Sequence, residues 1–247
     1  MSATNASELM PPLALLAGGM ATRLRPVTNL VPKSMVLVAG EPFIAHQLRL
    51  LRRERITDII ICTGYLGEQI SAFVGDGSRF GCQVRYAADG DRQLGTGGAL
   101  RQALPLFGEH FFVMYGDSYF DIAFLPVYET FMRAGYPALM TVFRNANRWD
   151  TSNVEFADGI IKRYDKVNRT PAMQYIDYGL GVLSAVALAR WPMSTPFDLA
   201  ELYGDLTERG QLAGYEVRER FYEIGSPAGL AETAAHLSAE LQERNDK

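Results

Sequence analysis

The chain has 247 residues, of which 48% are apolar and 21% are charged, and its formal net charge is −4. This balance is typical of a globular protein and excludes a disordered or fibrous chain. It leaves no excess of lysine and arginine for neutralising a phosphate backbone, so we expect no nucleic-acid partner. The two cysteines, Cys62 and Cys82, lie in apolar, strand-like stretches, which favours buried thiols in a reducing compartment.

Residues 1–10 are expected to form a flexible leader, and residues 11–247 a single domain. The apolar run Leu13–Ala17 is too short to span a bilayer, and no lysine or arginine precedes it, as one would in a signal peptide. We therefore expect a cytoplasmic protein without a membrane partner.

Short apolar runs alternate with segments of helical periodicity in the first half of the chain. The alternation predicts parallel strands joined by helices that cover both faces of a sheet. Ligands bind at the carboxyl ends of the strands in such sheets. We expect strands over Leu13–Ala17, Asp58–Thr63, Gln83–Ala87 and Phe111–Tyr115, and helices over Pro42–Arg55, Tyr65–Val74 and from Gly98–Leu104 onward.

The pattern changes after about Tyr136, where strand-like runs follow one another with short connections. Together the two halves predict an α/β protein with three α/β/α layers and a mixed, mostly parallel central sheet. The second half is expected to contain strands over Leu139–Arg144, Asn153–Phe156, Ile160–Tyr164 and Tyr175–Leu183, then helices over Asp198–Arg209 and Pro227–Gln242.

The loop after the first predicted strand has the residues of a phosphate site. Gly18 and Gly19 allow backbone N–H groups to approach an anion closely, and Arg23, Arg25 and Lys33 supply positive charge. A tight turn with solvated arginines is the alternative. The glycine spacing matches neither the dinucleotide fingerprint nor the P-loop, which leaves an NAD-dependent oxidoreductase as a distant third possibility.

Two later segments also carry candidate chemistry. The glycine-rich stretch Leu94–Leu100 opens a predicted helix, whose free N–H groups suit an anion or a base edge, unless it is only a turn. Asp117 follows the strand Phe111–Tyr115, where a carboxylate would face the ligand edge and bind a hard metal ion. An aspartate that caps a turn is the alternative there.

These segments together resemble the sugar-1-phosphate nucleotidyltransferase family, whose fold is Rossmann-like and of the nucleotide-diphospho-sugar transferase type. Such an enzyme transfers a nucleoside monophosphate from a nucleoside triphosphate to a sugar 1-phosphate and releases pyrophosphate. The resemblance is carried by Leu16-Ala17-Gly18-Gly19, Thr22-Arg23-Leu24, Pro26, Pro32-Lys33 and Leu94-Gly95-Thr96-Gly97-Gly98-Ala99-Leu100.

In that family the first loop wraps the triphosphate. The resemblance implies that Ala17, Gly18 and Gly19 contact the nucleotide and that Arg23 and Lys33 bind its phosphate oxygens as catalytic residues.

The later glycine-rich segment implies that Gly95, Thr96 and Gly98 border the nucleoside. Its form is most similar to guanylyltransferases that act on mannose or heptose 1-phosphate, so GTP and one of these sugars are favoured. Asp117 stands at the family's main Mg²⁺ ligand.

The second half adds residues for the acceptor and for a second metal ligand. Lys166 resembles the family's lysine on the sugar phosphate, and Asp177 and Glu155 stand at positions that bind the sugar. The segment Phe221–Pro227 resembles one whose aspartate is the second Mg²⁺ ligand, and Glu223 occupies that position here.

Two departures keep other functions open. Ala21 stands where the family normally has glycine, and Glu223 replaces an aspartate. A catalytically silent relative that binds nucleotide therefore remains an alternative, as does a cytidylyl- or uridylyltransferase for another sugar phosphate or phosphorylated metabolite. The family resemblance further implies a role in supplying NDP-sugars for polysaccharide biosynthesis, and a homodimer through the second-half strands is possible.

Overall fold

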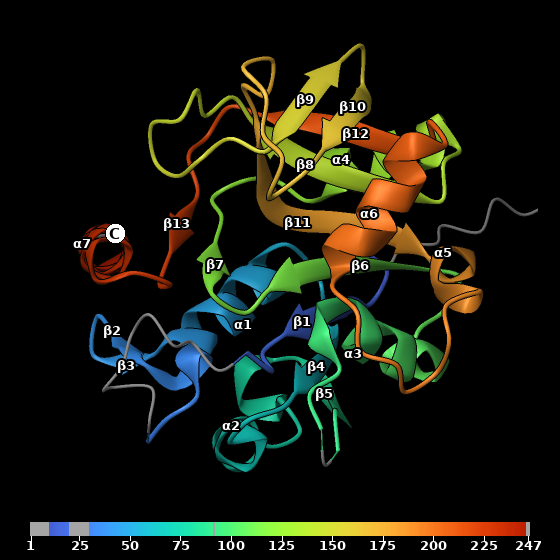
Figure 1. Ribbon diagram of the computed structural model, residues 1–247. Helices are drawn as coiled ribbons and strands as arrows, with labels where there is room; N and C mark the ends of the chain where they lie inside the picture. Colours follow the sequence, from blue (N-terminus) through green and yellow to red (C-terminus); the bar gives the residue numbers. More distant parts are fainter. Residues whose placement is uncertain (1–9, 20–29, 91, 246–247) are drawn as a thin grey trace, which may run out of the picture.

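A nine-stranded mixed sheet forms the centre of the structure (Figure 1). The computed structural model describes residues 10–19, 30–90 and 92–245. The expected leader thus lies outside the described residues except for Met10, which is only 9% exposed and packs into the core. None of the described helices combines the length and the apolar character that a membrane span requires.

Four parallel strands make up one half of the sheet. β1 (Leu13–Leu16) lies between β4 (Asp58–Thr63) and β6 (His110–Tyr115), and β5 (Gln83–Ala88) pairs with the outer side of β4. Strands of a parallel sheet are covered on both faces, which explains why β1 and β4 are almost uninterrupted apolar runs. The predicted strands of this half are confirmed to within a residue at each end.

The other half of the sheet is mostly antiparallel. β11 (Ile176–Ser184) joins it to β6, and among the remaining pairs only β8 with β12 is parallel. The sheet is therefore mixed, as predicted, with its parallel pairing concentrated in the first half. In order from β11, the strands are β8 (Ala138–Phe143), β12 (Leu212–Val217), β10 (Ile160–Tyr164) and β9 (Val154–Ala157).

Helices cover both faces of the sheet and confirm the three layers. Leu13 and Leu15 of β1 belong to one buried cluster, whereas Ala14 and Leu16 belong to the other, because alternate side chains of a strand point to opposite faces. The first cluster includes residues of α1 (Phe43–Arg53), α2 (Gly67–Val74), α4 (Leu125–Ala134) and α7 (Pro227–Asn245), and the second includes residues of α3 (Gly95–Ala103), α5 (Ala185–Ala189) and α6 (Leu199–Glu208).

Two small ribbons stand outside the large sheet. β2 (Leu37–Val38) pairs with β3 (Glu41–Pro42), and β7 (Ser118–Tyr119) pairs with β13 (Tyr222–Glu223). Strands of two residues carry no periodicity in the sequence, which is why they are absent from the predicted elements. The β7–β13 pair brings the last quarter of the chain to the end of β6.

The core predicts a large stability cost for truncating the first residue of α1. Phe43 is fully buried in the first cluster, so Phe43→Ala is expected to lower the free energy of unfolding by about 3–5 kcal/mol. Leu37→Ala, at a side chain that is 66% exposed, is the control and should change it by less than about 0.5 kcal/mol. Urea denaturation of both variants measures the difference, and equal midpoints would contradict the packing described here.

Candidate functional site

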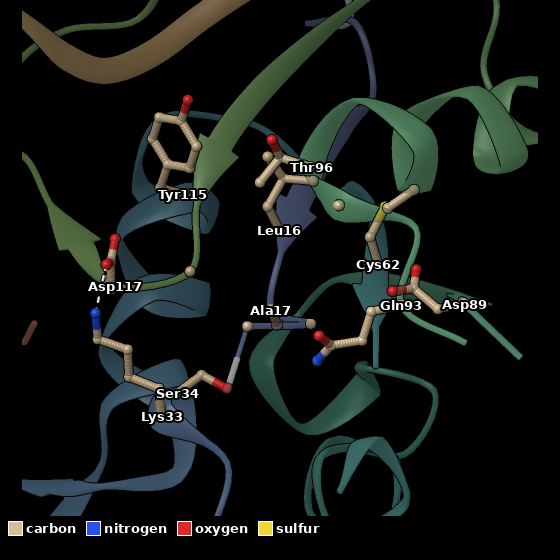
Figure 2. Close-up of a pocket in the computed structure, with 15 residues that line it drawn as sticks. Leu16, Ala17, Lys33, Ser34, Cys62, Asp89, Gln93, Thr96, Tyr115 and Asp117 are labelled. Atoms are coloured by element: carbon tan, nitrogen blue, oxygen red, sulfur yellow. Dashed lines mark hydrogen bonds and ion pairs between the residues drawn. The ribbon is translucent and has the colours of Figure 1, made fainter. Parts of the chain in front are cut away.

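A cavity of about 250 Å³ opens at the carboxyl ends of β1, β4, β5 and β6 (Figure 2). Three backbone hydrogen bonds between strand ends fix its floor: Ala17 N–H to Cys62 O, Gly116 N–H to Leu16 O and Asp89 N–H to Thr63 O, each 2.9 Å. This is the edge at which the sequence predicts ligand binding. The predicted site residues that line it are Ala17, Gly18, Gly19, Lys33, Gly95, Thr96 and Asp117.

The two ends of this cavity differ in their chemistry. Lys33 and Asp117 lie at one end, and the Lys33 ammonium is 2.6 Å from Oδ2 of Asp117. Cys62, Asp89 and Gln93 lie at the other end (Figure 2). Burial raises the pKa of the Cys62 thiol to about 12, with a smaller contribution from Asp89, so this cysteine stays protonated and unreactive.

A buried glutamine of α1 holds the turn that presents Asp117. The Gln47 side-chain amide donates to the carbonyls of Tyr115, at 3.2 Å, and Ser118, at 2.9 Å, on either side of Asp117. The Ser118 hydroxyl donates to Asp117 Oδ1 at 3.1 Å. Gln47 thus holds the backbone on both sides of Asp117, and the Ser118 hydroxyl bonds to its carboxylate. The Asp117 side chain is still 36% exposed.

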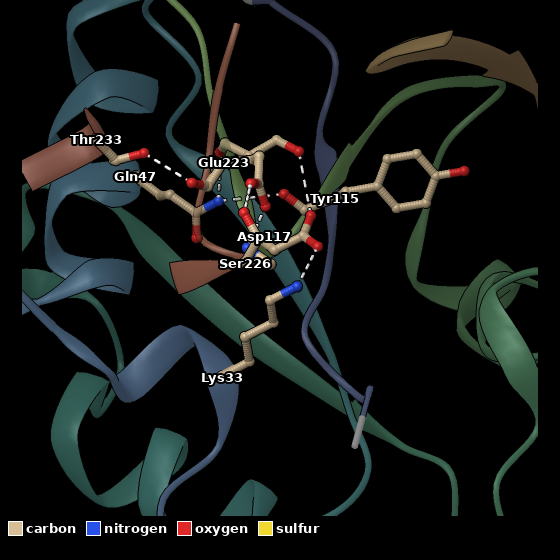
Figure 3. Close-up of polar contacts among 9 residues, drawn as sticks. Lys33, Gln47, Tyr115, Asp117, Glu223, Ser226 and Thr233 are labelled. Atoms are coloured by element: carbon tan, nitrogen blue, oxygen red, sulfur yellow. Dashed lines mark hydrogen bonds and ion pairs between the residues drawn. The ribbon is translucent and has the colours of Figure 1, made fainter. Parts of the chain in front are cut away.

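Glu223 lies beside this turn, at the start of α7 (Figure 3). Its carboxylate accepts hydrogen bonds from the Ser226 hydroxyl, at 2.7 Å, and from the Gly225 N–H. Its carbonyl accepts from the Thr233 hydroxyl at 2.8 Å. A carboxylate at a helix N-terminus satisfies unpaired N–H groups and is favoured by the helix dipole.

Three charged groups surround Gly225. A Cβ at that position would lie 2.6 Å from Glu223 Oε2, 2.9 Å from Lys33 Nζ and 3.8 Å from Asp117 Oδ2. The backbone also joins these parts, since Ile224 N–H donates to Asp117 O at 2.9 Å. The structure thus brings Lys33, Asp117 and Glu223 together, as the sequence predicts.

The donor set of this cluster suits Mg²⁺. Within the described part of the chain, no group of three or more His, Cys, Asp or Glu residues is placed to hold a metal ion. Mg²⁺ commonly takes only one or two carboxylates and completes its shell with water and substrate phosphates. Asp117 and Glu223 offer two such carboxylates. Each has other partners here: Lys33 for Asp117, and the Gly225 N–H and Ser226 hydroxyl for Glu223.

At the N-terminus of α3, two of the N–H groups that the sequence predicts to be free already have a backbone partner. The amides of Gly97 and Gly98 both donate to the carbonyl of Phe197, at 3.0 and 3.2 Å, and Gly98 does not line the cavity. Thr96 lines it, but its hydroxyl oxygen accepts from Leu199 N–H at 2.8 Å. The expectation of free donors therefore fails for Gly97 and Gly98, because a distant segment, residues 197–199, bonds to this turn of the helix.

Some glycines that line the cavity allow two backbone segments of the protein to approach each other closely, apart from any contact with a ligand. Gly95 has a φ of +71°, and a Cβ there would lie 2.6 Å from the Phe197 carbonyl oxygen. A Cβ on Gly18 would lie 3.2 Å from the backbone nitrogen of Gly64, whereas Gly19 faces open space. Of the two glycines in the first loop, only Gly19 is therefore unobstructed by the protein's own backbone.

A second cavity of about 920 Å³ adjoins the first. It includes Lys166 and Asp177, and it shares Lys33, Tyr115 and Asp117 with the smaller cavity. The Lys166 ammonium is 3.5 Å from Asp198 Oδ1 at the N-terminus of α6. Two of the three residues predicted from the second half for the acceptor phosphate and the sugar, Lys166 and Asp177, thus face one cavity.

The Asp177 carboxyl accepts two hydrogen bonds, yet its pKa is raised above the ordinary aspartate value. It accepts hydrogen bonds from Gly179 N–H at 3.0 Å and from the Tyr164 hydroxyl at 3.2 Å. Burial nevertheless raises its pKa, and the positive charge of Lys166 opposes the shift only in part.

Two predicted residues are not part of the described site. Glu155 lines neither cavity, because β9 is the outermost strand of the sheet and Glu155 pairs there with Arg163 of β10. Arg23 lies outside the described residues, as do Arg25 and Ala21. Their predicted roles therefore stay predictions.

Several residues that line the cavities are absent from the sequence predictions. The hydroxyls of Ser34 and Tyr115 are buried and have no hydrogen-bond partner among the described residues, which makes them candidates for contact with a ligand or water. Trp149, 47% exposed, lies over the larger cavity with the Arg220 guanidinium 3.8 Å from its ring centroid. Of these residues, Asp89 has a sequence signal, since it lies two residues after the end of a predicted parallel strand, as Asp117 does.

The raised pKa of Asp177 predicts a stabilising substitution. The folded protein binds the proton of this carboxyl more tightly than the unfolded chain, so its contribution to stability is lost as pH rises through the folded pKa. Asp177→Asn should therefore raise the free energy of unfolding at pH 7, and the gain should shrink below about pH 4, near the ordinary aspartate pKa.

A matched control has the opposite sign. Backbone hydrogen bonds from Asn168 and Val167 lower the pKa of Asp165, so its stabilising contribution is present at neutral pH and is lost as pH falls. Asp165→Asn should lower the free energy of unfolding at pH 7. Urea denaturation at pH 7 and pH 4 measures both variants, and a loss of stability in Asp177→Asn at pH 7 would contradict the assignment.

The chain is similar to known proteins over most of its length. The family described as nucleotidyl transferase matches residues 14–153. An N-acetylmuramate alpha-1-phosphate uridylyltransferase of Neisseria meningitidis is 39% identical over 117 residues, which cover 47% of this chain and 51% of that protein. A D-glycero-alpha-D-manno-heptose 1-phosphate guanylyltransferase of Campylobacter jejuni is 24% identical over 216 residues, which cover 86% and 94%.

A solved structure shares the fold. HddC from Yersinia pseudotuberculosis, complexed with GMP-PN, has a TM-score of 0.75 at 21% identity, with 92% of this chain and 100% of that chain covered. This likeness confirms the predicted fold type. The chain spans about half the length, or less, of several curated relatives that it matches.

Proposed function

The chain belongs to the nucleotidyl transferase family, and we propose that it transfers a nucleoside monophosphate from a nucleoside triphosphate to a sugar 1-phosphate, with release of pyrophosphate. One observation carries the proposal: the two cavities share Lys33, Tyr115 and Asp117 as a common wall. A reaction between two anionic substrates needs such a wall, where both phosphates meet charges that hold them in line.

The residues that line the two cavities support a different substrate for each. The smaller cavity, at the ends of the parallel strands, is the place for the nucleoside, and the larger one, with Lys166 and Asp177, is the place for the sugar phosphate. The acceptor phosphate is already anionic and attacks the α-phosphorus directly, so the protein needs no covalent nucleophile.

The charged side chains then have separate tasks. Lys33, now paired with Asp117, is positioned to neutralise phosphate oxygens of the nucleotide, together with Arg23 from the first loop. Lys166 holds the phosphate of the acceptor, and Asp177 accepts hydrogen bonds from sugar hydroxyls. These positions reduce repulsion between the substrates and align them.

Asp117 and Glu223 are the residues that would hold Mg²⁺. When bound, the ion would supply positive charge to the phosphate oxygens of both substrates. Gln47 and Ser118 orient the Asp117 carboxylate for this task. Glu223 would have to exchange its hydrogen bonds with Gly225 and Ser226 for the ion.

GTP and a heptose or mannose 1-phosphate are the substrates that we favour. The glycine-rich segment Leu94–Leu100 is of the guanylyltransferase form, and the Campylobacter jejuni relative, covered almost completely, is a heptose 1-phosphate guanylyltransferase. The product would be an NDP-sugar for cytoplasmic polysaccharide biosynthesis.

A uridylyltransferase is the second candidate. The Neisseria meningitidis relative has the higher identity, 39%, although over 117 residues only. The two relatives differ in the base they transfer, so the choice of base has to be measured.

Loss of either charged group at the nucleotide should abolish most activity. Arg23→Ala and Asp117→Ala are each expected to reduce turnover by roughly 10²–10³-fold, because each removes a positioned group that stabilises charge in the transition state. Pyrophosphate release measures turnover, and urea denaturation checks the fold. Glu129→Ala, at an exposed position of α4, is the control and should keep full activity. More than a tenth of wild-type activity in either site variant would contradict the proposal.

A substrate grid tests the reaction itself. Pyrophosphate release is measured with Mg²⁺ for four nucleoside triphosphates against mannose, glucose and heptose 1-phosphates. We expect the strongest rate with GTP and a heptose or mannose 1-phosphate. A strong rate with UTP instead would support the second candidate. A blank grid from protein that still binds a nucleotide would indicate a catalytically silent relative and would overturn the proposed function.

A further inference from the structure

The smaller cavity orients a nucleotide by the chemistry of its ends. Triphosphate oxygens belong near Lys33 at one end, which leaves the base for the opposite end, where Asp89 and Gln93 lie (Figure 2). This step rests on the proposed function, because it takes the ligand to be a nucleoside triphosphate.

Asp89 is held at that end by the backbone around it. It directly follows β5, and its N–H donates to Thr63 O at 2.9 Å. Its Oδ2 accepts from Leu94 N–H at 3.1 Å, which closes the turn between β5 and α3. The carboxylate is therefore fixed relative to the cavity before any ligand arrives.

The carboxylate also lacks the partners that a half-buried charge needs. In the described parts of the chain, no lysine or arginine forms an ion pair with Asp89, and its Oδ1 receives no hydrogen bond. Burial raises its pKa, while the Leu94 hydrogen bond lowers it in part. A half-buried carboxylate with one oxygen free of protein donors can accept hydrogen bonds from a ligand that supplies them.

Only one common base supplies two adjacent donors to a carboxylate. An ionised carboxylate is an acceptor only, with several lone pairs over two oxygens. Guanine presents N1–H and N2–H₂ side by side. Adenine and cytosine place a ring nitrogen acceptor beside their amino group, and uracil and thymine flank their single N–H with carbonyl oxygens. Each of these four bases would bring an acceptor against the carboxylate.

We propose that Asp89 is the specificity-determining residue of the nucleotide site and that it selects guanine by accepting hydrogen bonds from N1–H and N2–H₂. Oδ1 takes one of these bonds, and Oδ2 takes the other beside the Leu94 N–H that it already accepts. The selection of GTP thus rests on an acid at the end of β5, at a distance from the residues that hold the phosphates.

Binding of Mg²⁺–nucleotides by isothermal titration calorimetry tests this assignment. Wild-type protein should bind GTP about tenfold or more tightly than inosine triphosphate, which lacks only the 2-amino group, because a hydrogen bond to a charged group is lost. In Asp89→Asn the side-chain oxygen still accepts from Leu94, so the turn is kept. This variant should lose the preference for GTP over inosine triphosphate and gain affinity for xanthosine triphosphate, whose C2 carbonyl accepts from the amide.

Glu129→Gln on the exposed face of α4 is the control, since it changes the net charge equally and should leave all three affinities unchanged. Equal affinity of wild-type protein for GTP and inosine triphosphate would overturn the assignment, as would an Asp89→Asn variant that keeps the GTP preference. Turnover with UTP but not GTP would overturn it and leave the proposed function intact. Protein that binds no nucleotide at all would overturn both.

Discussion

β1 lies between β4 and β6 and pairs in parallel with both, so that Leu16 stands beside Cys62 on one side and Tyr115 on the other. Because parallel strands end at the same edge, every loop that follows them meets there. The first loop, the Asp117 turn and the Asp89 turn therefore reach one cavity, although long stretches of sequence separate them. The site depends on this register, since a shift of one residue would turn every side chain to the opposite face.

The two carboxylates of the site have different partners within the protein. Lys33 forms an ion pair with Asp117, whereas Glu223 accepts hydrogen bonds only from the uncharged Gly225 N–H and Ser226 hydroxyl, so the cluster around Gly225 keeps one carboxylate without a cation in the described part of the chain. Under the proposed function, two anionic substrates and a cation would exchange these internal partners for external ones. Asp177 and Asp89 differ, because burial raises the pKa of each and no ion pair with either forms among the described residues. Such acids are retained at a cost in stability, which is typical of groups that serve a ligand.

The second half of the chain completes the site through small contacts. The two-residue pairing of β7 with β13 sets Glu223 opposite Ser118, and thus next to Asp117. The carbonyl of Phe197 accepts from the amides of Gly97 and Gly98 in the first turn of α3. Both contacts join parts of the molecule that belong to different halves of the sheet, and both determine which groups remain available to a substrate.

The sequence by itself determined the three layers, most strands to within a residue or two, and the positions of Lys33, Asp117, Lys166 and Asp177. The strands could be predicted because buried parallel strands are continuous apolar runs, and Asp117 because a residue after such a strand faces the ligand edge. Lys33, Lys166 and Asp177 came instead from the resemblance of their segments to the sugar-1-phosphate nucleotidyltransferases. Only the tertiary structure decided that Glu155 lies away from both cavities, that Phe197 occupies the amides of Gly97 and Gly98, and that β7 pairs with β13. These outcomes depend on contacts between segments far apart in the chain, and no local pattern of residues records a contact of that kind.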